Sequence, residues 1–330
     1  MKILITGALG FVGVYLVRKM AAQSKARSRS GCGSMIIAAD LRQPDEKLGR
    51  FLAPVEKDIE IVRLDVTDRD AVHKLINEAS ITHIVHGAAL TPTVEQEMAQ
   101  PTHIVDVNLG GAINVLDAAA HSATVERLLT VSSSGIYGAP ANPPFRSQPE
   151  EGPLSLANLY TVTKYSAELL TQRYSQLCGK PMASVRLGPI YAPIELPSAS
   201  RPRISQPGQL LAALRDQREV KVAGPSVKCD WTHADDIAQA IWALLIAPRW
   251  RYSLYNVSNG VAVTFGDVVD EFVEHGLSAT WVPQPNQADI AMLPSQERLP
   301  MDISRLERDS GFVAQYDLTK GLATCVEEVR

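Results

Sequence analysis

The chain lacks several features that would place it in a special class of proteins. Its 330 residues contain no apolar run long enough to cross a bilayer, no internal repeat and no low-complexity segment. It has only four cysteines, which stand apart and form no Cys-x-x-Cys pair, so neither a zinc site nor a disulfide framework is indicated. The formal charge of -4 gives no general attraction to nucleic acid or to an anionic membrane, although local basic patches remain possible.

What remains is a soluble enzyme or binding protein. With 45% hydrophobic residues, a chain of this length can bury a substantial core in one large domain or two coupled ones. Met1 leads almost directly into a strand-like apolar run, which leaves no room for a signal peptide. We therefore expect a cytoplasmic protein that binds a small-molecule substrate, without nucleic acid, membrane or metal ion as a partner.

A glycine-rich turn follows the first predicted strand, residues 2–6. Gly7, Gly10 and Gly13 have the spacing G-x-x-G-x-x-G, and an amphipathic helix comes next. Glycines let the backbone turn tightly and approach a pyrophosphate, and the helix N-terminus presents free N–H groups to it. A plain turn between a strand and a helix would also accept three glycines. Its position directly after the first strand favours the dinucleotide site.

The second predicted strand, residues 35–39, ends at an acidic residue. A polar segment, residues 24–34, precedes it and is predicted to be an exposed loop. A carboxylate at Asp40 can accept both ribose hydroxyls of NAD and would repel the 2′-phosphate of NADP. Arg42 lies two residues further on and could instead accommodate that phosphate. The sequence favours NAD and does not exclude NADP.

Strands and helices continue to alternate along the chain. Further strands are predicted at residues 59–64, 81–86, 127–132, 184–187 and 254–257. A long helix is predicted over residues 101–120, and the cost of Gly110 and Gly111 inside it must be offset by close packing. This alternation predicts an α/β fold with a doubly wound parallel sheet, the Rossmann arrangement. In such sheets, ligands bind beyond the carboxyl ends of the strands.

Serines, a tyrosine and a lysine, whose side chains are suited to proton transfer, follow one another along the chain. Tyr160 and Lys164 are four residues apart and therefore share a helical face. An ammonium near a phenol stabilises the phenolate, so this tyrosine could exchange a proton with an alcohol or ketone near neutral pH. Serines at 132–134 end the fifth predicted strand, where a substrate oxygen would lie. Any long helix can carry such a pair on its solvated side, but the three signals together favour one pocket.

With these motifs the chain resembles the extended short-chain dehydrogenase/reductases of the NAD-dependent epimerase/dehydratase family. The resemblance also rests on residues 65–66, 86–89, 108–114, 132–138 and 186–193, and covers roughly the whole chain. It implies that Tyr160 is the general acid/base, that Lys164 lowers its pKa and binds the nicotinamide ribose, and that Ser133 is the catalytic serine. The implied cofactor contacts are Gly7, Gly10, Phe11, Val12, Gly13, Asp40, Leu41, Arg42, Asp65, Val66, Gly87, Ala88, Ala89, Asn108, Val131, Tyr160, Lys164, Leu187, Pro189 and Ile190.

The resemblance further implies a smaller C-terminal region that binds substrate. Residues 1–187, with 230–258 returning to them, would form the NAD-binding Rossmann domain, and residues 188–229 and 259–330 the substrate-binding region. A homodimer is expected through the helix that carries Tyr160, whose apolar positions are Tyr165, Leu169, Leu170 and Leu177. The candidate substrate contacts are Leu90, Ser134, Gly135, Arg201 and Lys228.

Departures from the family pattern narrow the range of reactions that we expect. Ser134-Gly135 stands where dehydratases carry Asp-Glu, so water elimination is not expected. Pro189 replaces an asparagine, and Cys229 an arginine, that contact the substrate diphosphate in nucleotide-sugar epimerases; Lys228, Arg201 or Arg203 could supply the missing charge.

The expected function is an NAD-dependent epimerase or dehydrogenase acting at a secondary alcohol or ketone of a sugar or sugar derivative, nucleotide sugars included. One alternative is an NAD(P)-dependent reductase of non-sugar ketones or aldehydes. Another, which the retained tyrosine and lysine disfavour, is a non-catalytic cofactor sensor.

Overall fold

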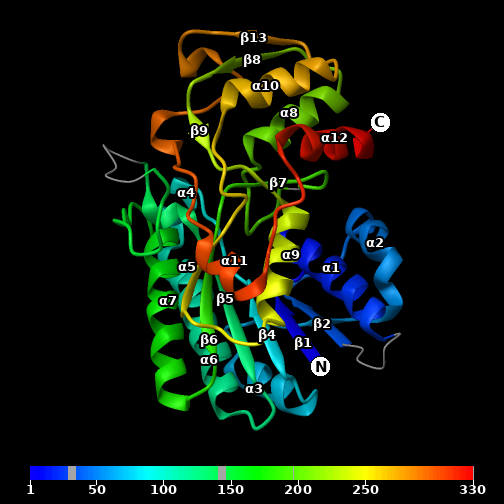
Figure 1. Ribbon diagram of the computed structural model, residues 1–330, viewed down its shortest axis with the longest axis vertical. Coiled ribbons are helices and arrows are strands. Elements are labelled where there is room, and N and C mark those ends of the chain that lie inside the picture. Colours follow the sequence, from blue (N-terminus) through cyan, green and yellow to red (C-terminus); the bar gives the residue numbers. More distant parts are fainter. Residues whose placement is uncertain (29–34, 140–145, 196, 330) are drawn as a thin grey trace.

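A seven-stranded parallel sheet forms the lower half of the protein in the computed structural model, which describes residues 1–28, 35–139, 146–195 and 197–329 (Figure 1). The strand order is β11-β6-β5-β4-β1-β2-β3, so the order reverses between β4 and β1. The predicted doubly wound α/β fold is confirmed. The strands in chain order are β1 (Lys2–Thr6), β2 (Met35–Asp40), β3 (Ile59–Arg63), β4 (His83–His86), β5 (Arg127–Ser133), β6 (Met182–Leu187) and β11 (Leu254–Val257).

Helices cover both faces of this sheet because its strands are apolar on both sides. Ile3 and Ile5 belong to one core cluster, with α1 and α9, whereas Leu4 belongs to another, with α3 and α6. The first face carries α1 (Phe11–Ser28), α2 (Glu46–Leu52), α9 (Ala234–Leu245) and α11 (Ser304–Ser310). The second face carries α3 (Arg69–Glu78), α6 (Gly111–His121) and α7 (Leu159–Cys178).

Two helix predictions differ from the structure. The helix predicted over 101–120 is divided into α5 (Pro101–Val105), a π-helical turn η2 (Asp106–Gly110) and α6. The close packing expected at its glycines is found at Gly111, where a Cβ atom would lie 2.6 Å from Val66 Cγ2, but not at Gly110. The loop predicted at 24–34 is wrong for its first residues, because α1 continues to Ser28, and residues 29–34 lie outside the described ranges.

The C-terminal segments build a second, smaller core at the top of Figure 1. Its central strand β8 (Val220–Ala223) lies between β13 (Ala279–Trp281) and β14 (Ile290–Ala291). Phe265, Phe272 and Leu322 are fully buried in this core. The helices around it are α8 (Gln206–Arg215), α10 (Phe265–Glu274) and α12 (Leu318–Val329). Short pairs β7 (Ile190–Tyr191) with β10 (Thr232–His233), and β9 (Lys228–Cys229) with β12 (Val263–Thr264), connect the two cores.

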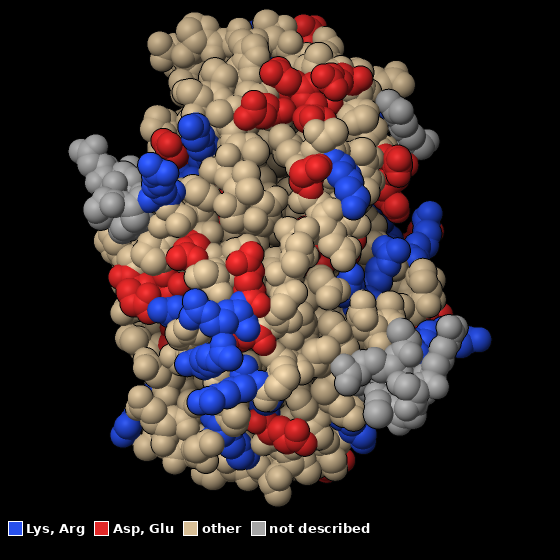
Figure 2. Space-filling model, in the orientation of Figure 1, with Lys and Arg blue, Asp and Glu red and all other residues tan. Residues whose placement is uncertain are grey.

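Charged side chains of both signs are spread over the face shown in Figure 2, with acidic ones gathered over α10. This mixture fits the small net charge of the chain. None of the helices in the described ranges is long and apolar enough to cross a membrane. Within the same part of the chain, no group of three or more His, Cys, Asp or Glu side chains is placed to hold a metal ion.

Candidate active site

The glycine turn joins β1 to α1 and leaves no room for side chains. Gly7 has a φ of +68°, and a Cβ atom there would lie 2.7 Å from Ala88 Cα, in the turn after β4. At Gly13, a Cβ atom would lie 2.1 Å from Gly7 O. The Gly10 N–H closes the turn on Gly7 O at 3.0 Å. The first turn of α1 therefore directs its N–H groups into an open, side-chain-free turn, as a pyrophosphate requires.

An acidic residue at the end of β2 braces this turn. Asp40 Oδ2 accepts the Leu9 N–H at 2.9 Å, and its Oδ1 accepts the Arg42 N–H at 3.0 Å. The Arg42 guanidinium donates to Leu9 O at 2.7 Å and lies 3.6 Å from Asp40 Oδ1. The carboxylate thus lies directly beside the glycine turn. The arginine is already engaged with the turn and its acid.

A cavity of about 920 Å³ opens beyond the carboxyl ends of β1, β2 and β4. The turn after β4 and the segment at Asp65 form opposite walls, and Ala199 and Ser200 lie over its edge. Its predicted lining residues are Gly7, Gly10, Asp40, Leu41, Arg42, Asp65, Val66, Gly87, Ala88, Ala89 and Leu90. Its unpredicted ones are Leu64, Thr67, Pro92, Gln96, Gln100, His103, Ile104, Asp106, Val107, Gly110, Asn114, Ala199 and Ser200. The glycine turn, the acid and this cavity together fit a dinucleotide such as NAD.

The remaining predicted cofactor residues lie in three groups outside that lining. Phe11, Val12 and Gly13 form the first turn of α1. Leu187 pairs with Ser133 in the sheet register, and Pro189 O accepts the Thr232 N–H at 2.8 Å just before Ile190 begins β7. Asn108, Val131, Tyr160 and Lys164 surround the junction of β5, η2 and α7.

Tyr160 meets Ser133 at this junction. An Asn158–Thr161 capping box begins α7, so Tyr160 lies in its first turn and projects toward the end of β5. The side chains of Ser133 and Thr91 lie close enough to its hydroxyl to oppose, as hydrogen-bond partners, the rise in the pKa of the phenol. The Ser133 Oγ also accepts the Gly135 N–H at 3.1 Å, which fixes the turn after β5. The predicted tyrosine and serine are thus in contact.

Lys164 follows Tyr160 by one helical turn, and its side chain is buried between α7 and the sheet. Its ammonium lies 5.9 Å from the centre of the Tyr160 ring and donates to Val131 O at 2.7 Å. Burial lowers the pKa of Lys164 to about 8, and the Glu168 carboxylate opposes that shift.

Burial also raises the pKa of Tyr160, while hydrogen bonding to Ser133 and the charge of Arg201 oppose the increase. The sequence argument expected the lysine charge to dominate and to lower this pKa. In the structure, desolvation of the phenol is the largest effect.

Two further polar residues near Lys164 and Thr163, His86 and Asn108, are fixed by hydrogen bonds. Asn108 lies in the π-helical turn, accepts the Leu90 N–H at 2.7 Å, and donates to Thr163 Oγ1 at 3.2 Å. π-helical turns of this kind are often found at functional sites. His86 Nδ1 is hydrogen-bonded to Thr6 Oγ1 at 2.7 Å, and burial lowers the pKa of this histidine to about 3. His86 is therefore a neutral, packed strand residue.

The residues predicted to contact the substrate lie in different places in the structure. Leu90 lines the cavity, and Ser134 and Gly135 form the turn that follows Ser133. Arg201 forms an ion pair with the buried Glu195, lies 4.7 Å above the Phe11 ring and acts on Tyr160 through its charge. Lys228 is different, because its side chain is exposed on β9.

Several polar residues near the site escaped the sequence argument. Thr91 binds the Tyr160 hydroxyl, and its place just beyond the carboxyl end of β4 was the available signal. Arg298 is half-buried beside Cys229, donates to the carbonyl oxygens of Ser295 and Glu297, and has its pKa lowered by burial. No local pattern marks Arg298, since Cys229, the thiol beside it, is far away in the sequence.

Comparison with known proteins agrees with this geometry. A family model described as the NAD dependent epimerase/dehydratase family matches residues 3–258. UDP-glucuronate 4-epimerase 1 of Arabidopsis thaliana is 25% identical over 347 residues, which cover 97% of this chain and 75% of the relative.

Two solved structures show the same fold. The UDP-glucose-4-epimerase of Stenotrophomonas maltophila, with bound NAD and formylated UDP-arabinopyranose, superposes with a TM-score of 0.81 and 22% identity, covering 100% of this chain and 98% of the other. The Thermus thermophilus UDP-glucose 4-epimerase, in complex with NAD, gives 0.77 and 22%, covering 100% and 99%. With a family model matching most of its length, the chain belongs to the NAD-dependent epimerase/dehydratase family.

Proposed function

We propose that the protein is an NAD-dependent epimerase that acts at a secondary alcohol of a nucleotide sugar. The observation that carries this proposal is the contact between Tyr160 and Ser133, with Lys164 one turn away, beside a cavity that begins at a glycine turn. The family and the names of the relatives support the same reaction class. The alternative, a reductase of non-sugar ketones or aldehydes, has no comparable support.

NAD, when bound, supplies an acceptor for the hydride of the carbon that carries the alcohol. Tyr160 removes the hydroxyl proton of that alcohol, and Ser133 hydrogen-bonds the same oxygen. Lys164 places a positive charge beside the phenolate and holds the ribose. Tyr160 keeps the proton within the site and returns it to the oxygen after the sugar has turned. The contacts for NAD are those predicted from the sequence, with Asp40 on the ribose.

The charges near Tyr160 favour an anionic substrate. The Arg201 guanidinium acts on Tyr160 through its charge and is kept in place by Glu195. Arg298 is half-buried with neutral carbonyl oxygens as partners, so an anion would stabilise it. We therefore assign a UDP-sugar as substrate, with the diphosphate toward Arg298 and a uronic acid carboxylate toward Arg201. UDP-glucuronate is the first compound to test.

The decisive experiment compares UDP-glucuronate, UDP-glucose and a hydrophobic ketone with the purified protein and NAD. We expect NMR to detect the 4-epimer of a UDP-sugar without accumulation of NADH. Accumulating NADH would instead identify a net dehydrogenase, and turnover of the ketone alone would identify a reductase. Tyr160→Phe should lower turnover at least about 100-fold, the usual contribution of a general acid/base, while NAD still binds. Tyr165→Phe, one turn along the same helix, is the matched control.

We also propose a homodimer through α7 and α6, which lie side by side. Val162, Leu169 and Leu177 on α7 and Ile113 on α6 are each more than a third exposed. The predicted Leu170 instead packs into the sheet core. Light scattering should give twice the mass of the chain.

A charge in the α7 face should disrupt this dimer. Leu169→Glu should give the monomer, whereas Val273→Glu, a similarly exposed valine on α10, should leave the mass unchanged. A wild-type mass that equals one chain at every concentration would contradict the dimer.

The domain division and the location are part of the same proposal. The core around α8, α10 and α12 would form the substrate-binding region, and α9 and β11 would complete the NAD-binding domain. A cytoplasmic location is supported by the free thiols of Cys178, Cys229 and Cys325. Cys32 lies outside the described residues.

A further inference from the structure

A buried carboxylate stands one helical turn beyond Lys164 on the same face of α7. Glu168 is 7% exposed and Lys164 6%, so both ionisable groups lie between the helix and the sheet. Charged side chains are rarely buried to this extent unless they are paired. The partners of this carboxylate therefore indicate what it does.

Both oxygens of Glu168 are occupied. Its Oε1 accepts the Ser132 hydroxyl at 2.5 Å and Arg186 Nε at 2.9 Å, and its Oε2 accepts Arg186 Nη2 at 2.6 Å. The arginine comes from β6 and is itself 2% exposed. The two-pronged pair fixes the position of the carboxylate, since a planar guanidinium binds both oxygens in only one orientation.

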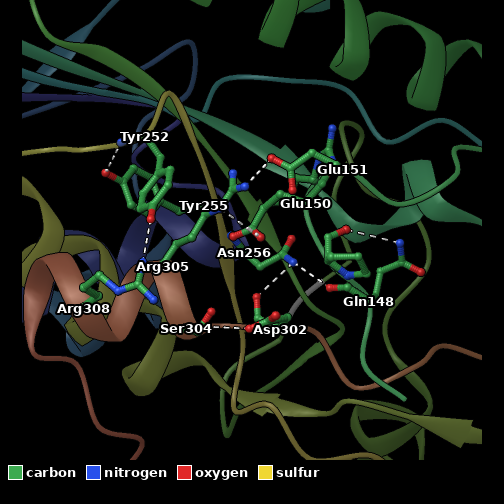
Figure 3. A network of polar contacts seen from close by, with 12 residues as sticks. Gln148, Glu150, Glu151, Tyr252, Tyr255, Asn256, Asp302, Ser304, Arg305 and Arg308 are labelled. Atoms are coloured by element: carbon green, nitrogen blue, oxygen red, sulfur yellow. Dashed lines mark hydrogen bonds and ion pairs between the residues drawn. The ribbon is translucent and has the colours of Figure 1, made fainter. Parts of the chain in front are cut away.

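The contacts continue from Arg186 to the segments at the edge of the sheet. Arg186 Nη1 donates to the Tyr137 hydroxyl at 2.8 Å, which donates to Asn256 Oδ1 at 2.8 Å. Figure 3 shows Asn256 between Gln148 and Asp302, whose carbonyl oxygens accept its amide at 2.9 and 3.1 Å. The carboxylate is thus held by a network that spans β6, β11 and the segment before α11.

This helical turn also holds the strand that ends in the predicted catalytic serine. Lys164 Nζ donates to Val131 O at 2.7 Å, and the next residue, Ser132, donates to Glu168. Ser133 follows and reaches Tyr160. Two successive residues of β5 are therefore bound to two side chains on the same face of α7, and the position of Ser133 follows from both.

Packing alone does not explain why charged residues occupy this place. Removing two charges from water is costly, and apolar side chains of similar volume usually stabilise such a junction at least as well as a buried ion pair. The charge of Glu168 has a specific neighbour in Lys164, whose ammonium is bound to a neutral carbonyl oxygen.

We propose that Glu168, held by Ser132 and Arg186, is a positioning residue for the active site: its carboxylate keeps the Lys164 ammonium charged and its contacts fix the end of β5 that carries Ser133. This inference rests on the proposed function, in which Lys164 must be charged to support the Tyr160 phenolate. Glu168 itself lies behind Lys164 and acts through it.

The other groups that face Lys164 leave this role to Glu168. On its own helix the lysine also faces Tyr160, whose phenol is kept neutral by burial in the free protein, where the midpoint is measured. From β4 it faces His86, which burial keeps neutral. The neighbouring η2 and α5 carry Asp106 and His103, which line the nucleotide cavity.

Removing the charge of Glu168 should make Lys164 titrate at lower pH. The midpoint can be followed in the free protein from the 13Cε resonance of Lys164, assigned with a Lys164→Arg variant. In Glu168→Gln, the midpoint should fall by about one pH unit, as expected when a buried cation loses an adjacent anion. In Ser132→Ala, the carboxylate loses a hydrogen-bond donor, so its charge acts more strongly and the midpoint should rise by a few tenths of a unit, roughly.

These opposite signs separate an electrostatic role from a structural one. Glu150→Gln removes another carboxylate of the same network that does not contact α7, and it should leave the midpoint unchanged. If Glu168→Gln does not fold, because Arg186 is left unpaired, Glu168→Gln with Arg186→Met removes both charges and should still lower the midpoint, by less than the single change because a cation is lost with the anion. If neither folds, the direction of the Ser132→Ala shift decides.

Unchanged midpoints, or shifts of the same sign in Ser132→Ala and the Glu168 variants, would overturn the proposal. Where turnover can be measured, the limbs of its pH profile should move with the Lys164 midpoint, whereas loosened packing would lower the rate without moving them. The resonance is measured without substrate, so failure to turn over any UDP-sugar would refute the proposed function and leave this result standing.

Discussion

The nucleotide side and the substrate side of this protein are built in different ways. The nucleotide side is a local turn in which Gly7 and Gly13 approach the backbone so closely that no side chain fits. The substrate side is assembled from distant segments, since Thr91 follows β4 and Arg201 follows β7, and both act on Tyr160. Backbone contact dictates the first, whereas side-chain identity dictates the second. Changes on the first side should therefore abolish binding, and changes on the second should alter specificity.

The largest effect is expected from a methyl group at Gly13. In Gly13→Ala, the Cβ atom would lie 2.1 Å from Gly7 O and 2.7 Å from the Ala8 carbonyl carbon, so the turn must open. The NAD dissociation constant, measured by calorimetry, should rise at least about 100-fold, or about 2.7 kcal/mol. Gly49→Ala on α2, where a Cβ atom meets nothing within 4 Å, should bind NAD normally and gain up to about 1 kcal/mol of stability. Normal NAD binding by Gly13→Ala would place the dinucleotide elsewhere.

A smaller and selective effect is expected at Arg201. If its guanidinium binds a substrate carboxylate, Arg201→Met should lower kcat/KM for UDP-glucuronate relative to UDP-glucose by about 10- to 100-fold, the value of a hydrogen bond to a charged group. Arg203→Met, two residues along and exposed, should change neither. An equal loss for both sugars would show that Arg201 supports Tyr160 and not the substrate.

The preference for NAD over NADP should change less in Asp40→Asn than the substrate preference changes in Arg201→Met. Asp40 accepts two backbone N–H groups, and the amide of Asp40→Asn can still accept one of them, so the turn should persist without its charge. The preference for NAD over NADP, as a ratio of dissociation constants, should then shrink about 10-fold, because the repulsion of the 2′-phosphate is gone and Arg42 remains. An unchanged ratio would mean that Asp40 does not face the ribose.

The smallest effect is expected from two buried titratable groups whose contributions to stability change with pH in opposite directions. Burial lowers the pKa of His86 to about 3, below its usual value, so the stability it contributes above about pH 6.5 is lost as the pH falls. Burial raises the pKa of Asp230, which follows β9 and accepts the Ser258 hydroxyl, to about 6, so the stability it contributes below about pH 3.9 is lost as the pH rises. These two groups therefore respond to acid in opposite directions.

Urea unfolding between pH 4 and pH 7 tests this difference. His86→Asn should reduce the rise of unfolding free energy with pH by up to about 1.4 kcal/mol per pH unit, and Asp230→Asn should increase it. The two variants serve as controls for each other. Parallel slopes in both variants and the wild type would show that neither group is desolvated in solution.

The same contrast explains what could be predicted from the sequence. The glycine turn, Asp40 and the Tyr160–Lys164 pair are defined by residues a few positions apart, and local spacing was enough to find them. Ser133 was assigned through the family resemblance, and its catalytic role stays a prediction. The strands of the large sheet were apolar on both faces and were placed within a few residues of their ends.

The rest depends on residues that only the fold brings together. Glu168 has Ser132 and Arg186 as partners, from two other strands, and no spacing rule connects the three. The pKa of Tyr160 was predicted to fall because its lysine neighbour was visible in the sequence, whereas the burial that raises it was not.

The π-helical turn η2 has one consequence for how this region can vary. It contains an additional residue relative to an α-helical turn, and Asn108 within it reaches both Leu90 and Thr163. Deleting one residue there would let α5 and α6 join as a regular helix and would rotate one against the other by about 100°. Asn108 could no longer reach both partners. Residues 106–110 should therefore tolerate substitutions more readily than insertions or deletions.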